Sequence, residues 1–225
     1  MDGQRYRAVL FDLDGTLVDS YAALTTAVNR ARATQRLDGL TTSDIRGLVG
    51  EGMERLLQKA LETTTIPVTA LDEFVRSYDE VCCEQSQLLD GVVSTIHRLH
   101  ENRIAMAVCT NKPTGFSTKI VEHLGLAPFF VAVVGPDAAG AQKPDARHVL
   151  HTLASVACEP HEALFVGDMP IDILAARNSG VDVAVIATGS ATKEQLVAEN
   201  PDYVLESFSD LVDIVCAVAL RETHS

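Results

Sequence analysis

The sequence predicts an α/β protein with a doubly wound, Rossmann-like parallel sheet and a small all-helical cap domain. Three observations carry this prediction: five short apolar runs, helical periodicity between the later runs, and a long helical stretch after the first run. The runs are continuous rather than alternating, which is typical of strands buried on both faces of a parallel sheet. They cover residues 8–11, 104–109, 131–134, 163–166 and 183–187.

Helices are expected between these strands, because apolar residues recur there at spacings of three and four. One pattern precedes the second run, one follows it, one precedes the fourth run and one follows that run. Gly180 ends the last of these patterns, as glycine often does just past a helix. A final amphipathic stretch around Leu211 and Val215 is expected to cover one face of the sheet. Strands that alternate with helices in this way indicate a parallel α/β fold.

The stretch from about 17 to 89 differs, because it contains three helical patterns and no strand-like run. We therefore expect a helical cap over residues 17–89 and an α/β core formed by residues 1–16 and 90–225. The Gly15-Thr16 turn and the Asp90-Gly91 pair mark the two borders.

Composition excludes several partners. The 225 residues include 18 Lys and Arg against 31 Asp and Glu, a formal net charge of −13. A binder of nucleic acid or of an anionic membrane surface needs a basic surface, so neither partner is expected. No apolar run reaches the length of a membrane span, and the polar first seven residues do not resemble a signal peptide. The five cysteines are odd in number and form no CxxC pair, which favours reduced thiols in a cytoplasmic protein.

Polar residues follow three of the expected strands. The first strand runs into Asp12 and Asp14, and the second into Thr110-Asn111-Lys112. The fourth runs into Asp168, with Asp172 four residues later. Ligands of open α/β sheets bind at the carboxyl ends of the strands, so three separate segments deliver polar groups to one edge.

Four carboxylates in one crevice repel one another and need cations. Mg²⁺ is the expected cofactor, because it prefers hard oxygen ligands. Lys143, which lies after the third strand and before a helix, can reach the same edge as a second cation.

These motifs, taken in order, resemble those of the haloacid dehalogenase superfamily. Residues 11–20 resemble its first motif, Thr110 the second, Lys143 the third, and the segment from Gly167-Asp168 to Asp172 the fourth. The resemblance covers essentially the whole chain, and the helical stretch looks like that family's small cap. The second aspartate, Asp14, is typical of the phosphatases in the superfamily and is lacking in the dehalogenases.

The resemblance implies a phosphomonoester hydrolase that works through an aspartyl-phosphate. Asp12 would be the nucleophile and Asp14 the acid and base, while Thr110 and the Asn111 N–H donate to the phosphate. Lys143 would neutralise charge on Asp12 and on the phosphate. The implied metal ligands are Asp12, the Asp14 carbonyl, Asp168 and, directly or through a water molecule, Asp172.

A finer resemblance is to phosphoglycolate phosphatases. It rests on Thr110-Asn111-Lys112-Pro113, Gly50-Glu51-Gly52, the 164–168 segment and Pro201-Asp202-Tyr203-Val204. Met169 departs from the pattern, where Ser or Thr is common. A small anionic phosphometabolite, 2-phosphoglycolate first, is therefore the expected substrate. In the cap, Gly50, Gly52, Arg46 and Arg55 are the expected substrate-binding residues, with Lys59 as a further neighbouring base.

Several alternatives remain open at this point. The chain could be a sugar-phosphate phosphatase or a phosphomutase of the same superfamily, or a catalytically idle binding protein. A monomer or a homodimer fits the sequence equally well. Two histidine pairs at i, i+3, His97/His100 and His148/His151, are interpreted as exposed helix residues rather than as a metal site.

Overall fold

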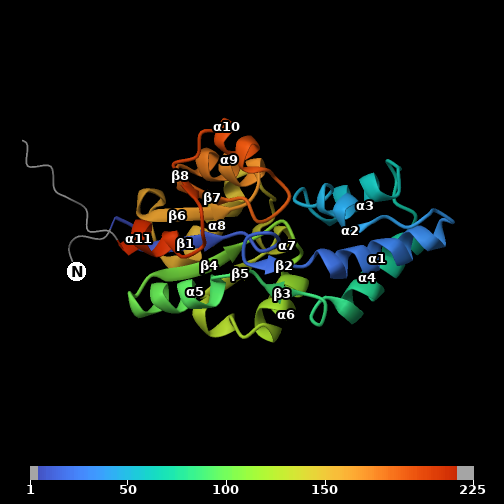
Figure 1. Cartoon of the computed structure of the whole chain (residues 1–225), viewed down its shortest axis with the longest axis horizontal. Helices are drawn as coiled ribbons and strands as arrows, with labels where there is room; N and C mark the ends of the chain where they lie inside the picture. Colours follow the sequence, from blue (N-terminus) through green and yellow to red (C-terminus); the bar gives the residue numbers. More distant parts are fainter. Residues whose placement is uncertain (1–4, 217–225) are drawn as a thin grey trace, which may run out of the picture.

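The computed structural model describes residues 5–216, so the terminal parts of the expected core (1–4 and 217–225) lie outside the described residues. A six-stranded sheet and its helices form one end of the molecule, and four helices form the other (Figure 1). The sheet strands are β1 (Ala8–Phe11), β4 (Ala105–Cys109), β5 (Ala132–Val134), β6 (Ala163–Gly167), β7 (Asp182–Ile186) and β8 (Tyr203–Leu205).

All six strands are parallel, in the order β5-β4-β1-β6-β7-β8. This confirms the doubly wound sheet. The chain builds one half of the sheet outward from β1 through β4 to β5, and then returns to the other side of β1 to build β6, β7 and β8. The point where the strand order reverses lies between β1 and β6, which is where ligands bind in open sheets of this kind.

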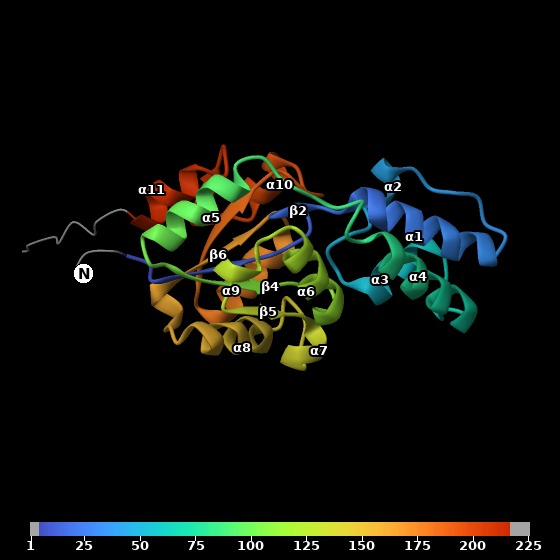
Figure 2. The ribbon, with the colours of Figure 1, turned by 90° about the horizontal axis from the view of Figure 1, so that it is seen from below.

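Helices cover both faces of the sheet (Figure 2). On one face, Val9 and Phe11 of β1 pack in a core that includes residues of α5, α6 and α11. On the other face, Ala8 and Leu10 pack in a core that includes residues of α8, α9 and α10. Alternate residues of one strand thus enter opposite cores, and this is why β1 is a continuous apolar run. The helices of this part are α5 (Val92–Glu101), α6 (Thr114–His123), α7 (Pro136–Ala139), α8 (Ala146–Val156), α9 (Pro170–Ser179), α10 (Lys193–Ala198) and α11 (Asp210–Cys216), with 3-10 turns η1 (Ala127–Phe129) and η2 (Pro160–Glu162).

The other end of the molecule holds the four helices that follow β1, which we call the cap helices. They are α1 (Tyr21–Thr34), α2 (Thr42–Arg46), α3 (Met53–Ala60) and α4 (Val68–Val81). Helices α1 and α4 pack along each other, and their buried side chains include Leu24 and Val28 of α1 and Phe74 and Tyr78 of α4.

Two short strands correct the expectation that the 17–89 stretch contains no strand. β2 (Val18–Asp19) pairs antiparallel with β3 (Gln87–Leu88), so the two chain segments that join the cap helices to the sheet are bonded to each other. Each strand has only two residues, which is too short to produce an apolar pattern. β8 was missed for a similar reason: it has three residues at the edge of the sheet, and two of them are only half-buried.

Within residues 5–216, no helix has both the length and the apolar character needed to cross a bilayer. The five cysteines all lie in this range and are free thiols.

His148 corrects a second expectation, because its side chain is fully buried in α8 rather than exposed. Its Nε2 lies 3.2 Å from the carbonyl oxygen of Val134, and its Nδ1 has no partner in the structure. Burial, with the nearby Lys143 cation, lowers the pKa of His148 to about 4. His151, one turn later, is exposed as expected.

A histidine whose pKa is lowered by folding makes the protein less stable as the pH decreases, because the unfolded chain binds the proton at a higher pH than the folded chain does. Between a pKa of about 6.5 in the unfolded chain and about 4 in the folded one, the loss reaches about 2 kcal/mol at pH 5. We expect His148→Gln to remove this loss, while His151→Gln, on the exposed face, leaves it in place. Urea unfolding at pH 7.5 and pH 5 measures the effect, and an equal acid loss in wild type and His148→Gln would contradict it.

Candidate active site at the carboxyl edge of the sheet

The loop after β1 delivers two aspartates to the carboxyl edge of the sheet. Asp12 continues the strand, since its N–H donates to the Val166 carbonyl at 2.9 Å. The chain then turns tightly through Gly15, which has a φ of +87° that favours glycine. A Cβ on Gly15 would also lie 2.5 Å from Oδ2 of Asp168, so the turn approaches the end of β6 closely.

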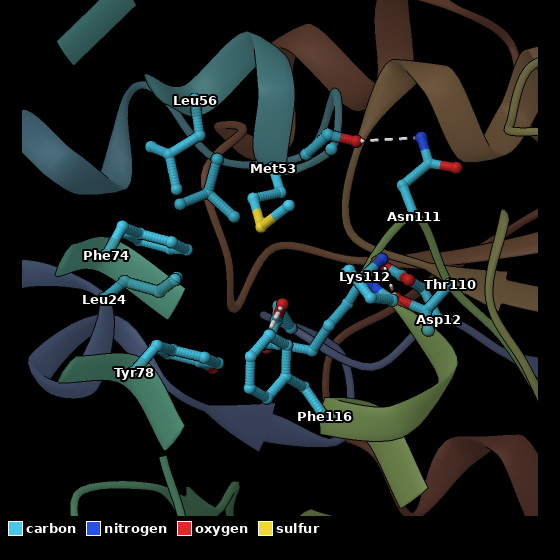
Figure 3. A pocket seen from close by; sticks show the side chains of 15 residues that line it. Asp12, Leu24, Met53, Leu56, Phe74, Tyr78, Thr110, Asn111, Lys112 and Phe116 are labelled. Carbon is cyan, nitrogen blue, oxygen red and sulfur yellow. Dashed lines mark hydrogen bonds and ion pairs between the residues drawn. The ribbon is translucent and has the colours of Figure 1, made fainter. Parts of the chain in front are cut away.

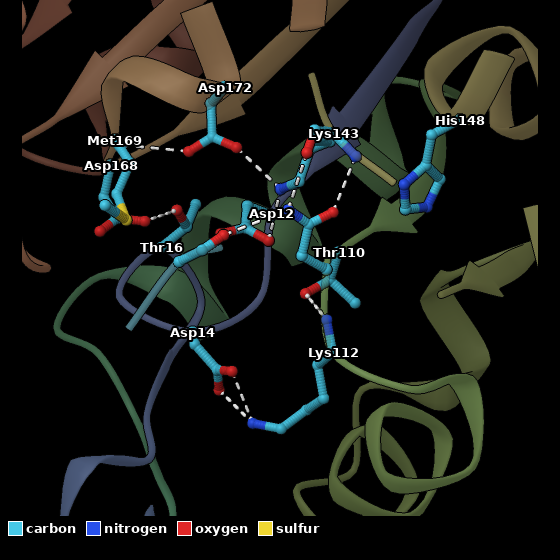
Figure 4. Close-up of polar contacts among 12 residues, drawn as sticks. Asp12, Asp14, Thr16, Thr110, Lys112, Lys143, His148, Asp168, Met169 and Asp172 are labelled. Atoms are coloured by element: carbon cyan, nitrogen blue, oxygen red, sulfur yellow. Dashed lines mark hydrogen bonds and ion pairs between the residues drawn. The ribbon is translucent and has the colours of Figure 1, made fainter. Parts of the chain in front are cut away.

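Three buried carboxylates meet at this edge (Figure 4). Asp12, Asp168 and Asp172 each offer an oxygen, and these oxygens all lie within 4.8 Å of one another. Asp168 is held by the Thr16 hydroxyl at 3.0 Å and by the Ser190 N–H at 3.2 Å. A Cβ on Gly189 would lie 1.6 Å from Oδ2 of Asp168, so that neighbour has to be a glycine. We call these three residues the acidic cluster.

Lys143 is the cation that the sequence predicted for this edge. Its Nζ lies 2.8 Å from Oδ1 of Asp12 and 2.7 Å from Oδ1 of Asp172, and its side chain is 1% exposed. Burial alone lowers the pKa of a lysine, but the two carboxylates outweigh burial and the pKa of Lys143 is raised. Lys143 is therefore a permanent ammonium in this site.

One lysine does not neutralise three carboxylates. Burial and repulsion from Asp172 and Asp12 raise the pKa of Asp168 well above its ordinary value. Burial raises the pKa of Asp172 to about 6, although Lys143 opposes the rise. The cluster thus has excess negative charge and a set of hard oxygen atoms, and these residues fit a divalent cation such as Mg²⁺.

The side chain of Asp14 is not part of the acidic cluster. Both of its oxygens lie 2.6 Å from Nζ of Lys112 (Figure 4). The Ser20 hydroxyl also donates to it at 2.5 Å. This corrects the expectation of four carboxylates in one crevice: Asp14 has its own lysine and faces away from Asp168. Only its backbone carbonyl remains available for a metal at the cluster, as the family resemblance implied.

Lys112 is the site residue that sequence reasoning missed. It was part of the Thr110-Asn111-Lys112 segment, but no role was given to it. Its side chain is 5% exposed, and the Asp14 carboxylate outweighs burial to raise its pKa. One feature of the sequence could have indicated a role for Lys112: it comes shortly after a strand that was expected to end at the same edge as Asp12 and Asp14.

Thr110 and Asn111 lie at the end of β4. Thr110 is buried, with 2% of its surface exposed, and its hydroxyl accepts a hydrogen bond from the Lys112 N–H at 3.2 Å. The Asn111 side chain accepts from the Lys143 N–H at 2.8 Å and donates to the Lys143 and Gly50 carbonyls, each at 3.1 Å. Asn111 therefore joins the loop that carries Lys143 to the Gly50 turn between the cap helices α2 and α3.

A pocket lies between this edge of the sheet and the cap helices (Figure 3). Asp12, Asp14, Thr110, Asn111 and Lys112 line its sheet side. Its other walls are mostly apolar, and they are formed by Leu24, Val49, Gly50, Gly52, Met53, Leu56, Phe74, Tyr78, Pro113 and Phe116. The space in the pocket that a water-sized molecule can occupy is about 50 Å³, so the pocket suits only a small ligand.

The structure does not bring the expected cap arginines to this pocket. Arg46 donates to the Thr188 and Gly189 carbonyls and stacks over the Tyr21 ring, so it holds the cap helices against the sheet. Arg55 is exposed and donates to Gln58 within its own helix. Lys59 likewise pairs with Glu51, at 3.0 Å.

The glycine turn does line the pocket, as expected. Gly50 and Gly52 flank Glu51, and the Gly50 carbonyl accepts from Asn111. A Cβ on Gly50 would lie 2.0 Å from the sulfur of Met169. The departure at position 169 therefore places an apolar side chain against the cap turn, while the Met169 N–H donates to Asp172 at 3.1 Å.

Comparisons with known proteins identify the family of this chain. A model of the family described as haloacid dehalogenase-like hydrolase matches residues 9–186. A protein from Caulobacter vibrioides named phosphoglycolate phosphatase is 36% identical over 209 residues, 90% of this chain and 88% of that protein. A protein of the same name from Photobacterium profundum is 37% identical over 221 residues, 92% of this chain and 94% of that protein.

Solved structures give the same result for the fold. The crystal structure of a protein described as a predicted phosphoglycolate phosphatase, from Haemophilus somnus 129PT, superposes with a TM-score of 0.85 at 26% identity. The match covers 93% of this chain and 98% of that one.

The crowded acidic cluster should destabilise the protein when no cation is bound. We expect Asp168→Asn to raise the melting temperature in chelator at pH 7.5 by roughly 2–4 °C, because a buried carboxylate with a raised pKa is removed. Stability that depends on a raised pKa is lost as pH rises, so the difference should shrink at pH 5, where protonation neutralises the wild-type cluster.

Added Mg²⁺ should raise the melting temperature of the wild type and have a smaller effect on Asp168→Asn. Asp145→Asn is the matched control. Its exposed carboxylate caps α8 and has a pKa lowered to about 2 by Arg147, so its removal should not stabilise the protein. Equal responses of the wild type and Asp168→Asn to Mg²⁺ would count against a metal at the cluster.

Proposed function

This chain belongs to the haloacid dehalogenase-like hydrolase family and is a phosphatase, and we propose that it hydrolyses 2-phosphoglycolate through a Mg²⁺-dependent aspartyl-phosphate mechanism. The observation that carries the mechanism is the division of the two loop aspartates between two lysines. Asp12 lies in the acidic cluster beside Lys143, whereas Asp14, two residues later, lies beside Lys112 in the pocket. This division supports a role for Asp12 toward the phosphate and a role for Asp14 toward the leaving group.

The steps follow from this placement. A carboxylate oxygen of Asp12 attacks phosphorus in line, the bond to the ester oxygen breaks, and an aspartyl-phosphate forms. Asp14 protonates the departing alkoxide and then takes a proton from the water that attacks the aspartyl-phosphate. Release of inorganic phosphate restores the Asp12 carboxylate.

The remaining residues of the edge support this chemistry. Lys143 neutralises charge on Asp12 and on the phosphoryl oxygens. The Thr110 hydroxyl and the Asn111 N–H are proposed donors to the phosphoryl group; the Asn111 side chain is occupied by Lys143 and Gly50. Mg²⁺, bound by Asp12, Asp168, the Asp14 carbonyl and, directly or through water, Asp172, would stabilise negative charge on the transferring phosphoryl group.

Substrate size and charge favour a short anionic ester. The named relatives act, by their names, on phosphoglycolate, and the pocket is small and mostly apolar. A phosphomutase needs a second group of cations for a sugar bisphosphate, and among the described residues that line the pocket Lys112 is the one cationic side chain. A sugar phosphate would set its hydroxyl groups against Leu56, Phe74 and Met53, which offer no hydrogen bonds.

The covalent step predicts opposite results for the two aspartates. Asp12→Asn should abolish turnover while the protein stays folded, because the nucleophile is lost. Asp14→Asn, given an aryl phosphate whose leaving group needs no acid, should accumulate a phosphorylated enzyme, because the base for hydrolysis is missing. Intact-mass measurement after rapid quench detects the added phosphoryl group. A folded Asp12→Asn variant that keeps near-normal turnover would refute the assignment.

Substrate choice is tested with a panel of phosphomonoesters. The wild type should have a kcat/KM for 2-phosphoglycolate that is at least about a hundredfold higher than for ethyl phosphate, an ester of similar size that lacks the carboxylate. Sugar phosphates should be poorer substrates than 2-phosphoglycolate. If ethyl phosphate is hydrolysed equally well, the substrate assignment fails, and the catalytic mechanism is then judged by the aspartate variants alone.

A further inference from the structure

The pocket has two polar groups on its leaving-group side that the proposed catalytic steps do not use. One is the ammonium of Lys112, and the other is the hydroxyl of Tyr78. The side chains around them, Leu24, Phe74 and Phe116, are apolar (Figure 3). Polar groups that converge inside an apolar pocket are the usual means of orienting a ligand.

Tyr78 is held rigidly by its neighbours. Its ring stacks on Phe74 with a centroid distance of 5.7 Å and meets Phe116 edge-on at 5.0 Å. The residue is 1% exposed, and its hydroxyl makes no hydrogen bond of normal geometry in the structure; its polar neighbour is the Lys112 ammonium. An unpartnered buried hydroxyl is costly, so a ligand that accepts its hydrogen bond restores what folding removed.

The ammonium group of Lys112 faces the Tyr78 ring. Its Nζ is 5.1 Å from the centre of the Tyr78 ring and 2.6 Å from each oxygen of Asp14. An ammonium group has three N–H donors, and both hydrogen bonds of this one in the structure go to Asp14.

The chemistry of the ester places its second anionic group near these two donors. In 2-phosphoglycolate the carboxylate carbon is two bonds from the ester oxygen. The ester oxygen must lie beside Asp14 to receive its proton, and Lys112 lies beside Asp14. A carboxylate attached so closely therefore falls within reach of Lys112 and of the Tyr78 hydroxyl above it.

On this basis, which rests on the proposed function, we propose that Lys112 and Tyr78 form the carboxylate subsite that determines substrate specificity. Lys112 gives the ion pair, and the Tyr78 hydroxyl gives a hydrogen bond. The apolar wall excludes water and so strengthens both contacts. The subsite selects esters whose carboxylate carbon is two bonds from the leaving oxygen. It takes over the role that sequence analysis gave to Arg46 and Arg55, which lie elsewhere.

The test is a specificity ratio, the kcat/KM for 2-phosphoglycolate divided by that for ethyl phosphate. Both esters need the acid of Asp14, so any effect of a variant on Asp14 cancels in the ratio. Lys112→Met should lower the ratio by about a hundredfold, and Tyr78→Phe by about tenfold. Lys119→Met is the matched control: this exposed lysine of α6 pairs with Asp79 of the cap helices at 2.7 Å, outside the pocket, and the ratio should stay within about twofold of the wild-type value.

The outcomes are distinct. A wild-type ratio near one means that the proposed substrate is wrong, and the subsite falls with it. A high wild-type ratio that Lys112→Met and Tyr78→Phe both keep overturns the subsite while the substrate stands. If Lys112→Met does not fold, Tyr78→Phe decides alone, because it removes a hydroxyl that makes no hydrogen bond of normal geometry in the protein and keeps the stacked ring. If only Lys112→Met lowers the ratio, the hydrogen bond from Tyr78 is wrong.

Discussion

The structure of the site depends on Lys143, which is buried between Asp12 and Asp172 at the edge of the sheet. A lysine that is 1% exposed is stable only with its charge paired, and the two carboxylates pair it from different segments. These segments meet because β1 and β6 are neighbours in the sheet although more than a hundred residues separate them. The loop that carries Lys143 is in turn fixed by Asn111, at the end of β4. Two ion pairs of Lys143 and the hydrogen bonds of Asn111 thus connect three strand ends and the cap turn at Gly50.

The same crowding makes the site unfavourable for folding. Asp168 is fully buried beside two other carboxylates, and glycines at positions 15 and 189 leave it no more room than it needs. The two apolar cores on either face of the sheet offset this repulsion, since β1 and β6 are buried along their whole length. A cation bound at the acidic cluster would reduce the repulsion among the three carboxylates. Stability of the sheet and affinity for the cation are therefore linked through the acidic cluster.

Much of this arrangement could be predicted from the sequence, for physical reasons. Central strands are continuous apolar runs because both of their faces are buried, so β1, β4 and β6 were identified, and with them the edge where Asp12, Thr110 and Asp168 meet. β2, β3 and β8 were missed because strands of two or three residues at the margin of a sheet have no distinctive pattern. The directions in which long side chains point could not be predicted from the sequence either. Lys112 turns to Asp14, and Arg46 turns to the 188–189 loop, because of tertiary packing that no local spacing encodes.

The two ends of the molecule contribute different kinds of side chain to the site. Both cations near the reacting groups, Lys112 and Lys143, come from segments that follow sheet strands, and so do all the carboxylates of the site. The cap helices contribute apolar side chains and one buried hydroxyl, and their arginines and lysine are engaged at the surface or against the sheet. The strand ends thus carry the charged groups, which catalysis requires to be positioned to within about 0.5 Å. The cap supplies low polarity, which makes each fixed charge act more strongly on a bound ester. In the proposed subsite, Lys112 from a strand end and Tyr78 from the cap helices act on the leaving group together, so a change of substrate would require changes in both parts.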